Sequence, residues 1–144
     1  MDETALHEIP GATSLIERFG RWPSFHDSEV LQMDLRRAGR SEVKIHIFEM
    51  TGDLDERGYY INRNHTIVSF HLTDTEVHEL SGFNHQNVLS GIAIRKTDRA
   101  DYEFDLDPIY GVGARLSART MRITHEAGIP QGSVYAGSAV QDGG

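Results

Sequence analysis

The chain has 144 residues, of which 38% are hydrophobic, and 22 acidic residues against 14 basic ones give a formal net charge of -8. This size and composition predict one folded domain with a single core, rather than a disordered chain. The negative charge argues against nucleic acid and anionic membranes as partners and favours a basic protein, while the absence of cysteine excludes disulfides and thiolate chemistry.

The N-terminal region predicts a short helix and no targeting segment. Two of the first three residues are acidic, and no run in the chain approaches the ~18 apolar residues that span a bilayer. We therefore expect a cytoplasmic protein. Residues 13–19 combine Ser and Thr cap candidates with apolar residues at helical spacing, which predicts a helix that ends at Gly20.

The middle of the chain alternates apolar and polar residues, a pattern typical of strands. Residues 31–35 and 43–47 are expected to form a hairpin. Residues 51–64 are rich in charge and glycine without a sustained period, so they are expected to form the longest loop, with a short extended piece at 59–61. Three further strands are predicted at residues 68–72, 77–80 and 88–94.

Residues 101–107 carry the clearest pattern in the chain, because acidic and apolar residues alternate with period two. This predicts a strand with one face in water. The acids on that face are Asp101, Glu103, Asp105 and Asp107. The strand is expected to form a hairpin with residues 114–125, across the loop DPIYGVG.

The register of this last hairpin follows from placing apolar residues opposite one another. The predicted cross-strand pairs are Tyr102 with Ala118, Phe104 with Leu116, Glu103 with Ser117, Asp105 with Arg115 and Asp101 with Arg119. Glu103 and Asp107 are left without an arginine. Because Met121 and Ile123 have the opposite parity from Leu116, a β-bulge is expected near residues 119–120.

The acidic row, formed by Asp101, Glu103, Asp105 and Asp107, has two interpretations. Successive carboxylates of the row are expected about 6.6 Å apart, which is too far for two of them to coordinate one small ion. The spacing instead suits binding of a partner that carries several cations. Alternatively, the row is a solvated strand face that Arg115 and Arg119 partly neutralise, since exposed ion pairs are common and contribute little energy.

Two loops gather polar side chains that could form a ligand site. Residues 25–29 hold an imidazole and two carboxylates, able to bind a metal or transfer a proton, or else to complete a turn. Residues 82–87 could recognise a peptide or a small polar ligand, or else use asparagines to satisfy backbone groups. The residues of this possible ligand site are His26, Asp27, Glu29, Asn84 and His85.

Motifs for nucleotide binding, serine hydrolysis, zinc proteolysis and EF-hand calcium binding are all missing from the sequence. We therefore predict no catalytic residue, no metal ligand and no cofactor. Whether the two polar loops meet is a property of the fold, so the sequence leaves the enzymatic alternative open.

A family resemblance rests on the segment Trp22-Pro23-Ser24-Phe25-His26-Asp27, on residues 65–72 (HTIVSFHL), on residues 82–94 (GFNHQNVLSGIAI) and on the acidic hairpin. In this order, over roughly residues 15–125, the chain resembles bacterial domains of the immunity protein 50 type, and uncharacterised relatives with a similar Trp-x-x-Phe-His-Asp segment. The resemblance implies a binding protein that neutralises a cognate bacterial toxin.

The sequence thus predicts an α+β domain over residues 1–129, with a mainly antiparallel, curved sheet of about six strands and one short N-terminal helix. Residues 130–144 are expected to be a flexible tail. The predicted function is non-enzymatic binding of a basic, toxin-like protein through the acidic row. The alternative is a metal- or small-ligand-binding protein, or an enzyme, that uses the two polar loops.

Overall fold

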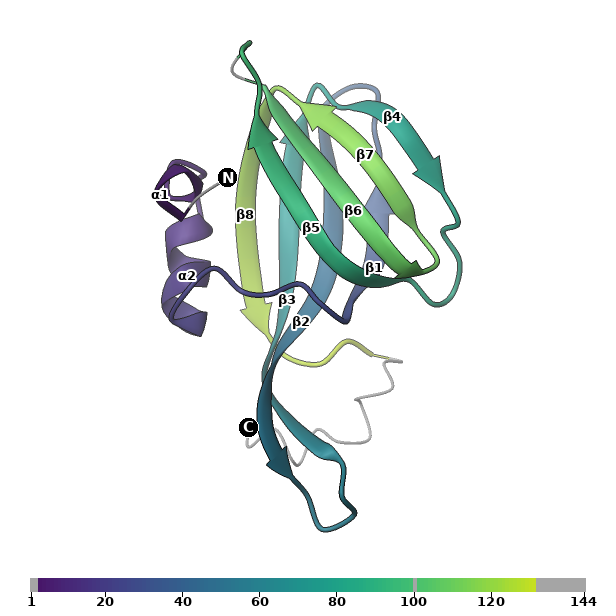
Figure 1. Cartoon of the computed structure of the whole chain (residues 1–144). Coiled ribbons are helices and arrows are strands. Elements are labelled where there is room, and N and C mark those ends of the chain that lie inside the picture. The colour runs from purple at the N-terminus through teal and green to yellow at the C-terminus, as the bar shows by residue number, and fades with distance from the viewer. Residues whose placement is uncertain (1–2, 100, 132–144) are drawn as a thin grey trace.

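The computed structural model describes residues 3–99 and 101–131 (Figure 1), so most of the tail expected after residue 129 lies outside the described residues. Its helices are α1 (Glu3–Leu6), a single turn, and α2 (Ala12–Phe19). The prediction of a short helix ended by Gly20 is confirmed, with a left-handed φ of 79° at that glycine. Neither helix is long and apolar enough to cross a membrane.

Eight strands form one antiparallel sheet in the order β4-β7-β6-β5-β1-β2-β3-β8. They are β1 (Ser28–Asp34), β2 (Arg40–Leu54), β3 (Tyr60–Thr73), β4 (Glu76–Ser81), β5 (Val88–Lys96), β6 (Tyr102–Tyr110), β7 (Gly113–Ala118) and β8 (Thr120–Ala127). The antiparallel sheet is confirmed, but it has eight strands rather than about six. One reason is that the strand expected over residues 114–125 is two strands.

The sheet folds over on itself into two layers, with the core between them (Figure 1). Strands β5, β6, β7 and β4 form the front layer, and β1, β2, β3 and β8 form the rear layer. The layers join at a corner where β1 and β5 pair through only two residues each. Phe70 of β3 and Phe104 of β6 meet across the core, with ring centroids 4.7 Å apart. Packing between the layers therefore supplies the apolar burial that stabilises the domain.

The predicted register of the last hairpin is confirmed, since Phe104 pairs with Leu116 and Tyr102 with Ala118. The expected bulge is instead a break at Arg119, between β7 and β8. Strand β7 pairs with β6 in the front layer, whereas β8 pairs with β3 in the rear layer. The change of parity at residue 119 thus lets the chain cross between layers while its apolar residues stay buried.

Residues 51–64 are not the predicted loop. Residues 51–54 and 60–64 are the ends of β2 and β3, joined by a turn at 55–59, and together they form a two-stranded ribbon beyond the body of the sheet (Figure 1). Thr51 Oγ1 donates to the Ile61 carbonyl at 2.7 Å, and the Asp55 amide donates to the Tyr59 carbonyl at 2.8 Å. The ribbon has no apolar period because most of its side chains remain exposed.

The two edge strands differ in what covers them. The amide of Ile123 in β8 donates to the Pro10 carbonyl at 2.8 Å, so the segment between the helices covers that edge. Gly11 has φ 91°, and a Cβ there would overlap the Ile123 carbonyl oxygen. Strand β4 pairs only with β7, and all six of its residues are exposed.

Candidate functional site

The strand pattern of β6 places its acids on the outer side of the front layer. Tyr102, Phe104 and Leu106 are buried, and the alternating residues face outward, as period two predicts. We call this outer surface the acidic face. Its charged residues are Glu79 of β4, Arg95 of β5, Glu103, Asp105 and Asp107 of β6, and Arg115 of β7.

Arg95 lies between two of the predicted acids. Its Nε and Nη2 donate to Glu103 Oε2 at 3.1 and 2.8 Å, and Nη2 also donates to Asp105 Oδ2 at 3.1 Å. The hydrogen bond to Glu103 and the charges of both acids raise the pKa of Arg95. The expectation that Glu103 lacks a cation is therefore wrong, because its partner comes from β5 rather than from β7.

The predicted pairing of Asp105 with Arg115 is confirmed, with Arg115 Nε 3.8 Å from Asp105 Oδ1. The predicted pair of Asp101 and Arg119 is wrong. Arg119 Nη1 lies 3.9 Å from Asp74 Oδ2, and its amide donates to the Thr73 carbonyl, because the chain has turned toward the rear layer by this point. Asp101 precedes β6, and its carbonyl accepts a bond from the Thr97 amide at 2.7 Å.

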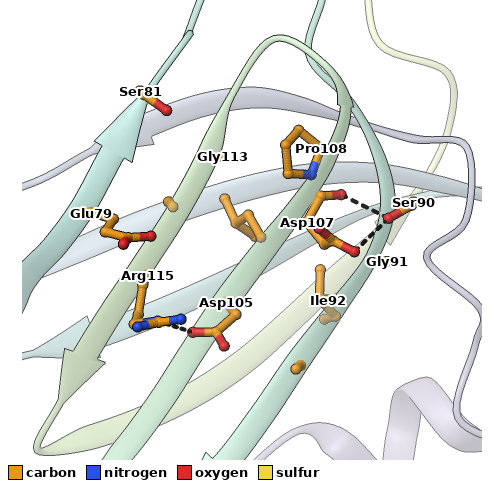
Figure 2. Close-up of a pocket in the computed structure, with 13 residues that line it drawn as sticks. Glu79, Ser81, Ser90, Gly91, Ile92, Asp105, Asp107, Pro108, Gly113 and Arg115 are labelled. Atoms are coloured by element: carbon orange, nitrogen blue, oxygen red, sulfur yellow. Dashed lines mark hydrogen bonds and ion pairs between the residues drawn. The ribbon is translucent and has the colours of Figure 1, made fainter.

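Two acids of the acidic face form no ion pair within the described part of the chain. Asp107 is exposed and accepts a hydrogen bond from Ser90 Oγ at 2.8 Å. Glu79 stands opposite Arg115 in the pairing of β4 with β7, without an ion pair. Both residues line a shallow hollow of about 520 Å³ (Figure 2). The arginines thus hold Glu103 and Asp105 in place and leave a surplus of negative charge beside them.

A second hollow continues the acidic surface toward the start of β6. Its charged lining residues are Asp74, Glu76, Asp98, Asp101, Glu103, Arg99 and Arg119. Acids outnumber arginines here as well. Asp101 and Glu103 therefore lie at one hollow and Asp105 and Asp107 at the other, so the predicted row borders both hollows.

The polar side chains of residues 26–29 mainly complete a turn. His26 Nδ1 lies 3.2 Å from the Ser90 carbonyl oxygen, which only accepts, so Nδ1 carries the proton of this bond. His26 Nε2 lies 3.6 Å from Asp27 Oδ1, and the backbone of Asp27 is left-handed, with φ 64°. Glu29 lies on β1, where burial raises the pKa of its carboxyl. These contacts fit the turn interpretation of the segment.

The loop before β5 is organised by Asn87, which is buried. Its Oδ1 accepts from the amides of Asn84 and Val112 at 2.9 and 3.1 Å, and its Nδ2 donates to the Asn84 carbonyl at 2.6 Å. Asn84 Oδ1 accepts from the Gln86 amide. His85 is exposed. Within residues 3–99 and 101–131, no hydrogen bond or ion pair joins His26 to His85, and no three metal-ligating side chains form a cluster.

Two residues of the acidic face, Glu79 and Arg95, and a buried pair of histidines were not predicted from the sequence. Glu79 and Arg95 belong to strands whose pairing with β7 and β6 was not predicted. His46 Nε2 lies 3.0 Å from His65 Nδ1, and both rings are buried. Burial, and then the charge of His65, lower the pKa of His46 to about 4. The alternation of His46 with Ile45 and Ile47 predicted a strand but gave no signal of this burial.

Comparison with known protein families gives a match over most of the chain. The family model described as Immunity protein 50 matches residues 11–127, from the residue before α2 to the last residue of β8. No curated protein and no solved structure gives a significant match to the chain.

Proposed function

Because the chain belongs to the Immunity protein 50 family, we propose that it binds a basic toxin protein through the acidic face and thereby neutralises it. The family supports an immunity-type role in general. The observation that carries the choice of surface is the surplus of acid around Asp107 and Glu79, beside a row of carboxylates already held in place.

The acidic face has two properties that suit a protein partner. Its acids stand on β6 and β4 and its cations on β5 and β7, so the charges are fixed on paired strands rather than on mobile loops. Its net negative field attracts a basic surface and accelerates encounter, an effect that salt weakens. Arg95 and Arg115 fix carboxylates in one geometry, which reduces the entropy lost when the partner binds.

The first test is capture followed by rescue. The tagged full chain is used to capture proteins from a lysate of the source organism at low and moderate salt, and the captured protein is then expressed alone and together with the chain. We expect a basic protein that is released by salt, is toxic alone and is tolerated when the chain is present. A captured protein that is harmless, or whose toxicity the chain does not relieve, would overturn the proposal.

A second test locates the surface. The double change Asp107→Asn and Glu79→Gln removes two charges from the acidic face, and Asp53→Asn with Glu56→Gln removes the same number from the ribbon as a matched control. We expect the first pair to slow association with the captured toxin about tenfold at low salt and to flatten its salt dependence. Equal effects of the two pairs would show that total charge, rather than this face, governs binding.

A further inference from the structure

Strand β4 ends the described sheet, and all six of its residues are exposed, so no described segment covers its outer edge. On the opposite edge, Pro10 supplies a backbone acceptor to Ile123 of β8. Strand β4 has β7 on one side and no strand on the other. Its remaining backbone groups are therefore available to another chain, as an uncovered edge generally is.

The side chains of β4 divide between two faces. Val77 pairs with Leu116 and Leu80 with Ala114, so both lie on the core side of the sheet. They are nevertheless 46% and 45% exposed, because β4 ends the layer and nothing described packs over them. An additional strand would extend the sheet at this point and would bury these two side chains further.

The other face of β4 is acidic. Glu76 pairs with Ser117 and Glu79 with Arg115, so both acids lie on the outer side, next to the acidic face. The pairing shifts between Val77 and Glu79, where His78 Nε2 lies 2.9 Å from Ser117 Oγ. The strand therefore presents an apolar side and an acidic side to anything that pairs with its edge.

From this pattern we infer that β4 accepts a strand of the toxin in which basic and apolar side chains alternate. Main-chain hydrogen bonds to the open edge would hold the added strand, as in other cases of strand addition. Its apolar side chains would lie beside Val77 and Leu80, and its cations beside Glu76 and Glu79. The inference rests on the proposed function and specifies how the partner docks beside the acidic face.

A second copy of this chain is a poorer occupant of the same edge. Antiparallel pairing of β4 with itself would place Glu76 and Glu79 of both copies on one outer face, where like charges repel. A cationic strand meets the same acids with opposite charge. Charge complementarity therefore favours a basic partner over self-association.

The test uses two synthetic peptides of alternating lysine and valine. One has an ordinary backbone, and the other has the same sequence with every backbone nitrogen methylated, which keeps charge and side chains but removes the strand donors of both edges. The full chain is titrated with each peptide at low salt, and amide hydrogen exchange is followed by NMR. We expect the ordinary peptide to protect amides of β4 and to bind at least about tenfold more tightly than the methylated one.

A matched pair of variants controls for the apolar contribution. Leu80→Lys should abolish binding of the ordinary peptide, whereas Leu54→Lys, at a comparably exposed residue of the ribbon, should leave it unchanged.

If both peptides bind equally, or if the protected amides lie outside β4, strand addition is wrong even when the toxin rescue succeeds. A dimer in light scattering whose β4 amides are protected without peptide would also overturn it. Failure of the rescue test would refute the proposed function independently.

Discussion

The rear and front layers of the sheet differ in how far their polar groups are buried. In the rear layer the edge of β8 is covered by residues 10–11, and the buried rings of His46 and His65 are in contact through Nε2 of one and Nδ1 of the other. In the front layer β4 has an uncovered edge, and the outer surface carries exposed ion pairs with surplus acid. Breaking a buried polar contact costs more stability than breaking an exposed ion pair, because the buried group that remains is left unsatisfied away from water. We therefore expect changes in the rear layer to affect stability and changes in the front layer to affect binding.

The largest effect is expected at Gly11, whose change would uncover the rear edge. Gly11→Ala places a Cβ on a residue with left-handed backbone and directly against the Ile123 carbonyl. The segment between α1 and α2 must therefore move away from β8. We expect the free energy of unfolding to fall by more than about 3 kcal/mol in urea denaturation.

Gly20→Ala provides the control for Gly11. Gly20 has a similar φ of 79°, but no atom lies within 4 Å of the added Cβ. This variant should cost only about 1 kcal/mol, the price of the left-handed backbone alone. Equal losses in the two variants would mean that contact with β8 adds nothing to stability.

The next effect concerns Asn87, at the corner where the two layers meet. Its carbonyl accepts from the Val30 amide of β1, and its side chain binds the amides of Asn84 and Val112. Asn87→Ala leaves a buried donor unsatisfied at Val112, so we expect a loss of about 2 to 3 kcal/mol in urea denaturation. Asn84→Ala should cost less than about 1 kcal/mol, since water replaces its exposed bonds. The reverse order of the two losses would contradict the assigned role of Asn87.

The buried His46 makes the stability of the rear layer depend on pH. Its pKa is about 4 in the folded chain, against about 6.5 when exposed, so between these values the unfolded state binds a proton that the folded state does not. Its contribution is complete above pH 6.5 and is lost as the pH falls toward 4. We expect wild-type protein to lose about 2 kcal/mol more than His46→Gln between pH 7 and pH 4.5, from urea midpoints at each pH. Parallel pH profiles would show that His46 does not titrate differently on folding.

The parts of the fold that the sequence predicts are those in which one face is buried. Helix α2 and the pairing of Phe104 with Leu116 could be predicted because burial imposes a period on the residues. The ribbon over residues 51–64 could not, because most of its side chains stay exposed and no period results. The break at Arg119 produced the expected change of parity, but parity alone does not distinguish a bulge from a crossing between layers.

The candidate site was predictable only within a single hairpin. The acids of β6 and the partner Arg115 lie on neighbouring strands joined by a short turn, so local register placed them correctly. Glu79 and Arg95 reach the acidic face through pairings with β7 and β6 that the strand patterns do not specify, because each strand has two possible neighbours. The negative charge of the acidic face was therefore predictable from the sequence, whereas the positions of its arginines were not.

The smallest effect on stability, and the sharpest contrast with Gly11, is expected at Arg95. Arg95→Gln removes the cation shared by Glu103 and Asp105, but these groups are exposed enough that water replaces the lost contacts. The urea midpoint of Arg95→Gln should therefore equal that of the wild-type protein within error.

Association of Arg95→Gln with the captured toxin should become several-fold faster at low salt, because the acidic face becomes more negative by one charge. This increase in rate should vanish at high salt. Arg63→Gln, which changes net charge equally on the ribbon, is the control. Slower association in Arg95→Gln alone would mean that fixing the carboxylates matters more than the added charge, and would assign to Arg95 a positioning role in recognition.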